Sequence, residues 1–242
     1  MTIEILIILA VLVVALLYSS VGHAGASGYL AVMALVSISP ELTRPTALIL
    51  NIFVAIIATV QFYRAGFFDW KVFYSFAVTS IPFAFLGGLV KLPTNLHKIL
   101  LGGVLLVAAI RLAWNFASDK QLFEPKLWIA LSLGAIIGLL SGLTGVGGGI
   151  FLTPVLLLTN WTETKKAAGI SAMFILVNSI SGLLGSYSQI NTLSVTVWYW
   201  IAAAIVGGLL GSTIGSRYFD TITLRRVLSL VLILAGFKLI LF

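Results

Sequence analysis

Long apolar runs alternate with short polar connectors along the whole chain. Most runs reach the length of about 20 residues that a helix needs to cross the hydrocarbon core of a membrane. The runs at 26–38 and 147–159 have only about 13 residues and are too short to cross upright. This pattern predicts an all-α polytopic membrane protein. The ten runs cover 3–21, 26–38, 43–63, 71–91, 96–114, 127–143, 147–159, 167–186, 194–215 and 222–242.

Composition supports the membrane assignment. Of the 242 residues, 60% are hydrophobic and only 9% are charged, which is too few charges to cover the surface of a soluble domain. The net charge of +7 comes from Lys and Arg in the connectors, so it indicates membrane topology and not a nucleic-acid partner. The absence of cysteine excludes disulfides and thiolate sites.

The two halves of the chain resemble each other on either side of the polar connector 115–126. The stretch YLAVMALVSISPELTRPTA (29–47) aligns with FLTPVLLLTNWTETKKAAG (151–169). Each half has five apolar runs, an odd number, so a chain that crosses the membrane at every run begins its second half on the opposite side. The second copy is then inverted relative to the first, as in many secondary transporters. We therefore predict two inverted five-segment repeats. Their boundaries are 1–116 for the first repeat, 117–126 for the linker and 127–242 for the second repeat.

The basic residues test this plan. If every run changes side, or if each short run turns back as a re-entrant segment, the Lys and Arg residues divide ten against four between the two sides, which places both termini outside the cytoplasm. In the alternative, eight spans in two four-helix repeats, the division is only eight against six. The richer side of the first plan holds Arg64, Lys71, Arg111, Lys120, Lys126, Lys165, Lys166, Arg217, Arg225 and Arg226, and the other holds Arg44, Lys91, Lys98 and Lys238.

Glycines interrupt the apolar pattern just before each short run. The second half contains GLTGVGGGIFLTP (142–154) and the first contains SSVGHAGASG (19–28). Glycine costs about 1 kcal/mol against alanine in a helix interior, and irregular backbone at membrane depth is tolerated only inside protein or beside a cavity. We therefore predict non-helical breaks at 22–28 and 145–149. The N–H groups that open each following short helix would then form an anion-binding end.

Polar residues near the breaks are rich in hydrogen-bond donors, which suits a small oxyanion. Close helix packing is the alternative role for glycines, and helix-to-helix bonding is the alternative for the buried amides. We expect His97 to be interfacial, and Arg44 and Lys166 to anchor the chain at the membrane surface. The candidate substrate-binding residues are Ser20, Gly22, His23, Gly25, Ser27, Asn51, Thr144, Gly145, Gly147, Gly148, Gly149, Ser171 and Asn178.

Catalysis has little support in the sequence. All seven acidic residues fall at the ends of runs or in connectors, and the two histidines lie far apart, so we expect no catalytic residues, no metal site and no cofactor. We expect the partners to be a small anion and the lipid bilayer, with the proton as the candidate coupling ion. The oligomeric state is left open.

Three motifs resemble the sulfite exporter TauE/SafE family of membrane transporters, also called TSUP: GVGGGIFLTP (145–154), GHAGASGYLAVMAL (22–35) and RPTALILNIFVA (44–55). The resemblance covers essentially the whole chain. It implies an inner-membrane permease that exports sulfite or an organosulfonate. The first half lacks a full glycine run, and His23 would be the substitute donor there. The alternatives are uptake of another small anion, and a non-transporting assembly component or lipid-headgroup enzyme.

Overall fold

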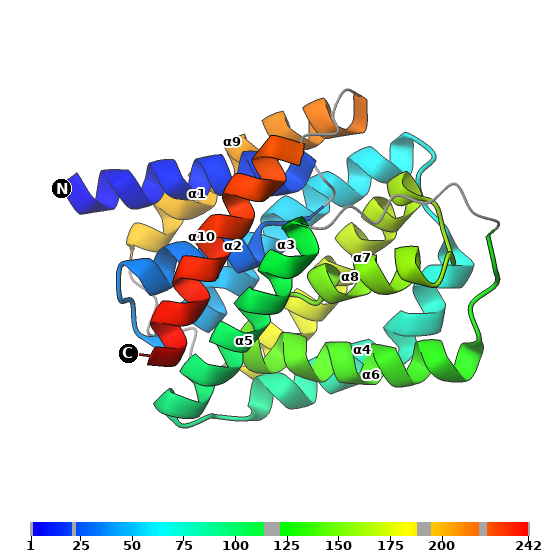
Figure 1. The fold of residues 1–242 in the computed structure, drawn as a ribbon, viewed down its shortest axis with the longest axis horizontal. Coiled ribbons are helices and arrows are strands. Elements are labelled where there is room, and N and C mark those ends of the chain that lie inside the picture. Colours follow the sequence, from blue (N-terminus) through cyan, green and yellow to red (C-terminus); the bar gives the residue numbers. More distant parts are fainter. Residues whose placement is uncertain (1, 21–22, 114–121, 188–194, 218–221, 242) are drawn as a thin grey trace.

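The computed structural model describes residues 2–20, 23–113, 122–187, 195–217 and 222–241, and these residues form ten helices (Figure 1). The helices follow the predicted apolar runs closely, so the all-α polytopic fold class is confirmed. Their bounds are α1 Thr2–Ser20, α2 Ala26–Leu35, α3 Pro40–Arg64, α4 Trp70–Leu89, α5 Thr94–Ala113, α6 Leu127–Thr144, α7 Gly149–Leu158, α8 Thr164–Gly185, α9 Thr196–Arg217 and α10 Ile222–Leu241.

Two of the helices are too short to span a membrane. α2 and α7 have 10 residues each, a length of about 15 Å, whereas the hydrocarbon core is about 30 Å thick. Six others, α1, α3, α4, α6, α8 and α9, are long and apolar enough to cross. The chain is therefore a multi-pass membrane protein.

Each short helix folds back beside the long helix before it. The N–H of Phe123, just before α6, donates to the carbonyl of Asn160, just after α7, over 2.8 Å, so the end of α7 returns to the start of α6. In the first half, α2 runs back toward the side of the molecule where α1 begins and α10 ends (Figure 1). We call α1–α2 and α6–α7 the first and second hairpins. This is the re-entrant arrangement, not the eight-span alternative in which each long and short pair forms one broken crossing helix.

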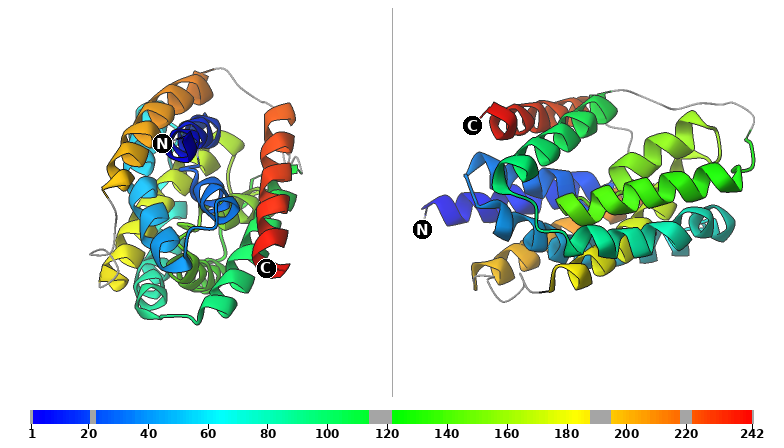
Figure 2. Two further views of the ribbon diagram at one scale, coloured as in Figure 1. Left: turned by 90° about the vertical axis from the view of Figure 1, so that its left-hand side faces the viewer. Right: turned by 90° about the horizontal axis from the view of Figure 1, so that it is seen from below.

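Helices of one half pack mainly on helices of the other. α4 packs on α6 and α9 packs on α1, while α3 packs on α8 and α5 packs on α10 (Figure 2). Glycines allow these close approaches: a Cβ on Gly87 would collide with backbone of α6, and one on Gly207 with backbone of α1. Every one of these pairings has its counterpart when the two halves are exchanged, so the packing of the helices has the symmetry of two repeats.

Candidate functional site

The second glycine break separates α6 from α7. Gly145, Gly147 and Gly148 have φ angles of 83°, 79° and 83°, in the left-handed region that other residues rarely adopt. α7 then begins at Gly149. The chain therefore leaves helical geometry over 145–148, as predicted, whereas Gly149 is already the first residue of α7.

The first break is shorter than predicted. Gly25, with a φ of 95°, is the residue before α2, and its carbonyl accepts the N–H of Tyr29 at 2.9 Å. Helical hydrogen bonding thus begins at once, so Ser27 and Gly28 lie in the first turn of α2 and not in the break. Gly22 lies outside the described residues.

A buried hydrogen-bonded bridge joins the two hairpins. His23 Nε2 lies 3.1 Å from the Oγ1 of Thr153 on α7, and Ser171 Oγ on α8 lies 2.8 Å from the same hydroxyl. Thr153 also donates to the carbonyl of Gly149 at 3.0 Å. All three bridging side chains are buried. The structure thus brings His23 and Ser171 together through Thr153, which sequence reasoning missed although it lies one turn after the glycine run.

Two tyrosines contribute hydroxyls at the first break. Tyr18 OH accepts a hydrogen bond from Ser27 Oγ at 3.1 Å. Tyr29 OH is buried and has no partner among the described residues, and a Cβ on Gly25 would lie 2.9 Å from it. The phenol of Tyr29 therefore faces the backbone of the break. The sequence offered no signal for it, because an aromatic residue in an apolar run usually serves packing.

Polar atoms also converge on the second break. Asn51 Nδ2 lies 3.5 Å from the carbonyl of Gly145, at the outer limit of a hydrogen bond. A Cβ on Gly147 would lie 3.0 Å from Asn51 Nδ2 and 3.1 Å from Ser179 Oγ. Within the described part of the chain, Asn51 Oδ1 and Ser179 Oγ are buried without hydrogen-bond partners. These groups and the N-terminus of α7 surround Gly147 with unused hydrogen-bonding capacity.

The cavity between the two breaks is small. It measures about 10 Å³ and is lined by residues of both hairpins and α8, among them Tyr18, His23, Ser27, Val146 and Ile175. A single water needs about that much space, so an anion with several heavy atoms does not fit. In this conformation the space between the hairpin tips is therefore closed to a solute of that size.

Arg44 is not a surface anchor. Its side chain is buried, and its guanidinium donates to the carbonyls of Gly88, at 2.8 Å, and Val90, at 3.0 Å, at the end of α4. A Cβ on Gly145 would lie 3.1 Å from Arg44 Cγ. The prediction that Arg44 anchors the chain at the membrane surface was wrong, because the free carbonyls at the C-terminus of α4 accept the hydrogen bonds of the guanidinium inside the protein. His97, in the first turn of α5, is likewise buried, at 6% exposure.

Three predicted site residues use their side chains elsewhere in this conformation. Ser20 donates to the carbonyl of Leu17 and Thr144 to that of Leu140, both over 2.7 Å, so both bond back to their own helices. Asn178 accepts a hydrogen bond from Ser80 Oγ and thereby joins α8 to α4. Among the described residues, no group of three His, Asp or Glu side chains is placed to hold a metal ion.

The sequence profile of one family extends across both hairpins and the helices around them. The family is described as Sulfite exporter TauE/SafE, and its profile matches residues 7–239. The chain belongs to the TauE/SafE family.

Curated relatives agree with this TauE/SafE assignment. A probable membrane transporter protein of Sinorhizobium fredii is 42% identical over 96% of both chains. Another from Bacillus subtilis is 26% identical over 97% of this chain and 98% of its own, and one from Methanocaldococcus jannaschii is 34% identical over 51% of this chain and 47% of its own. No solved structure matches the chain at a significant level. This TauE/SafE protein is a membrane transporter.

Proposed function

We propose that this transporter exports a small sulfur-containing oxyanion, sulfite or an organosulfonate, and binds it between the tips of its two hairpins. The observation that carries the proposal is the meeting of the two breaks, where His23 of the first hairpin contacts Thr153 of the second. Each hairpin brings the N-terminus of a short helix toward this point. The name of the family supports the substrate class.

The chemistry around the breaks favours an anion. The N-terminus of a helix carries unpaired N–H groups and the positive end of the helix dipole, and α2 and α7 each begin beside a glycine in the left-handed conformation. Hydroxyls of Tyr29 and Ser179 add buried donors that have no partner among the described residues. None of the described side chains that line the cavity between the breaks is acidic. An oxyanion would satisfy these donors when the tips open.

Alternating access follows from the opposite entry of the hairpins. The first hairpin enters from the side where α1 begins, and the second from the side where α6 begins (Figure 1). Withdrawal of one tip breaks the contact between His23 and Thr153 and opens the site to one side of the membrane only. An anion that replaces this contact would let the tips close again around it. His23 is the candidate group for coupling transport to protons.

The division of basic residues between the two sides of the membrane gives the proposed orientation in a bacterial or archaeal inner membrane. The side that would hold ten basic residues faces the cytoplasm, which leaves both termini outside. The chain has no native cysteine, so single-cysteine variants report accessibility without background. We expect a membrane-impermeant maleimide, added outside intact cells, to label Lys91→Cys but not Lys126→Cys; the reverse pattern would invert the topology.

Flux into proteoliposomes tests the function. Purified protein is reconstituted in lipid vesicles, and uptake of sulfite, sulfate and taurine is measured with and without a pH gradient. We expect sulfite or taurine to move faster than into empty vesicles, and a pH gradient to change the rate if protons are coupled. Absence of flux for sulfite and taurine, with carboxylates transported instead, would overturn the substrate class. Initial rates in vesicles sorted by orientation would separate export from uptake.

A further inference from the structure

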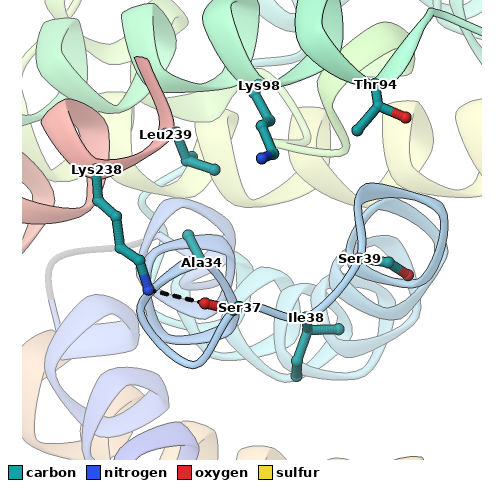
Figure 3. Close-up of a pocket in the computed structure, with 8 residues that line it drawn as sticks. All are labelled: Ala34, Ser37, Ile38, Ser39, Thr94, Lys98, Lys238 and Leu239. Atoms are coloured by element: carbon teal, nitrogen blue, oxygen red, sulfur yellow. Dashed lines mark hydrogen bonds between the residues drawn. The ribbon is translucent and has the colours of Figure 1, made fainter. Parts of the chain in front are cut away.

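A second, much larger cavity lies away from the hairpin tips. It measures about 300 Å³, which is within the range of small-molecule sites. It opens where the C-terminal end of α2 meets the start of α3, the start of α5 and the end of α10 (Figure 3). It is therefore on the side of the molecule where α1 begins, at the outer end of the first hairpin.

Two lysines line this cavity from different helices. Lys98 projects from α5 toward the cavity, and Lys238 reaches across from α10 (Figure 3). Lys238 Nζ donates to the carbonyl of Leu35 at 2.8 Å and to Ser37 Oγ at 3.0 Å. Lys238 thus caps the end of α2, while Lys98 extends the positive surface to the opposite wall.

The remaining polar side chains that line the cavity are hydroxyls, which can also donate hydrogen bonds. Ser39 is the residue before α3 and its hydroxyl makes no capping bond to that helix, and Thr94 is the first residue of α5. Hydroxyls of Ser37, Ser39 and Thr94 therefore line the cavity together with the two ammonium groups, with Ser39 and Thr94 at the N-terminal ends of α3 and α5. No described lining residue is acidic. The combination attracts negative charge from several directions.

We infer that this cavity is a second oxyanion site, separate from the site between the hairpin tips, in which Lys98 and Lys238 hold a sulfate-like or phosphate-like group. The group comes either from a free anion in solution or from the headgroup of an anionic lipid, because both present the same oxygens to the lysines. The site acts on the first hairpin, because an anion bound to Lys238 competes for the ammonium that caps α2. The inference does not depend on which solute the central site carries.

Lysine protection locates such a site directly. The full-length protein in nanodiscs of zwitterionic lipid is acetylated with a water-soluble N-hydroxysuccinimide ester, and modification of each lysine is followed by mass spectrometry. Sulfate is the probe, and chloride at equal ionic strength controls for screening. We expect sulfate to slow acetylation of Lys98 and Lys238 by about threefold or more, the effect of one modest charge-assisted contact. Lys91, an exposed lysine in the connector before α5 that does not line the cavity, is the internal control.

A second arm separates the two sources of the oxyanion. In nanodiscs that contain phosphatidylglycerol, a bound headgroup protects the same two lysines without added sulfate. A Lys98→Gln variant then loses the protection of Lys238 in whichever arm showed it, whereas Lys91→Gln keeps it. Protection in either arm supports the inference and names the source. If Lys98 and Lys238 respond no more than Lys91 in both arms, the inference is overturned, whatever the flux experiments show.

Discussion

The second glycine break uses three residues in the left-handed conformation, whereas the described part of the first uses only Gly25. The first break is surrounded instead by side chains that carry hydrogen-bonding groups: Tyr18, His23, Ser27 and Tyr29. The second hairpin therefore reverses through glycines in the left-handed conformation, whereas the described part of the first break presents side-chain hydrogen-bonding groups. The two halves reach a similar shape by different chemistry, so equivalent positions in them are not expected to respond equally to mutation.

The largest effect is expected at Gly147 in the second break. Gly147 and Gly66 share a φ of 79°, so alanine at either position costs about 1–2 kcal/mol of backbone strain. A Cβ on Gly66 meets nothing within 4 Å, but one on Gly147 would lie 2.8 Å from Ile175 Cγ2 and would crowd Asn51 and Ser179. We expect Gly147→Ala to weaken sulfite binding by about tenfold or more, and Gly66→Ala to leave it unchanged.

Calorimetry on detergent-purified variants that keep the wild-type elution profile measures the difference between these two variants. Gly66→Ala serves as the control for strain alone. Equal affinities for sulfite in well-folded Gly147→Ala and Gly66→Ala proteins would show that the glycine run serves helix packing and not binding.

The next effect concerns the bridge between the hairpins. Thr153→Val keeps the shape of the side chain but removes the hydroxyl that contacts His23 and Ser171, a loss of about 1–3 kcal/mol. We expect a lower maximal flux, with a smaller effect of His23→Ala in the Thr153→Val background than in the wild type. Thr159→Val is the matched control, since the bonds that the Thr159 hydroxyl makes among the described residues go to carbonyls of the last turn of α7. If the losses of flux caused by Thr153→Val and His23→Ala simply add in the double variant, the two side chains do not act together.

A smaller effect is expected from Tyr29→Phe in the first break. The hydroxyl of Tyr29 has no partner among the described residues, so its removal breaks no hydrogen bond in the closed state and leaves the melting temperature unchanged or raised. If the hydroxyl binds the anion in the open state, affinity falls by about threefold to tenfold. Thermal unfolding and calorimetry on one preparation give both numbers. A loss of stability without a loss of affinity would make Tyr29 a structural residue.

The smallest effect is expected from Ser20→Ala. Ser20 Oγ bonds to the carbonyl of Leu17 in its own helix, so its removal changes stability by no more than about 0.5 kcal/mol and leaves sulfite affinity unchanged. The affinity is measured beside that of Tyr29→Phe. If Ser20→Ala weakens binding as much as Tyr29→Phe, the hydroxyl of Ser20 turns toward the solute when the hairpin opens.

Much of the site was beyond prediction because its residues meet only in three dimensions. Asn51 lies 94 positions before Gly145, and His23 lies 130 positions before Thr153, yet each pair is in contact. The motifs marked His23, Asn51 and Ser171 as candidates, but nothing local distinguished them from Ser20, Thr144 and Asn178, whose side chains bond elsewhere. Thr153, Tyr29 and Ser179 escaped notice because a hydroxyl in an apolar run becomes a site residue only through its neighbours.

The pattern of apolar runs and glycines was enough to predict the helices and the second break. Apolar runs of spanning length predict helices, because lipid cannot satisfy a free backbone. The glycines clustered before the second short run predicted where the chain leaves helical geometry, and Gly145, Gly147 and Gly148 do so. The arrangement of those helices depends on tertiary packing. The short helices fold back, Arg44 is buried against the end of α4, and the space between the hairpin tips is only about 10 Å³. These outcomes depend on packing between segments far apart in the chain, and the local pattern of apolar and polar residues does not encode that packing position by position.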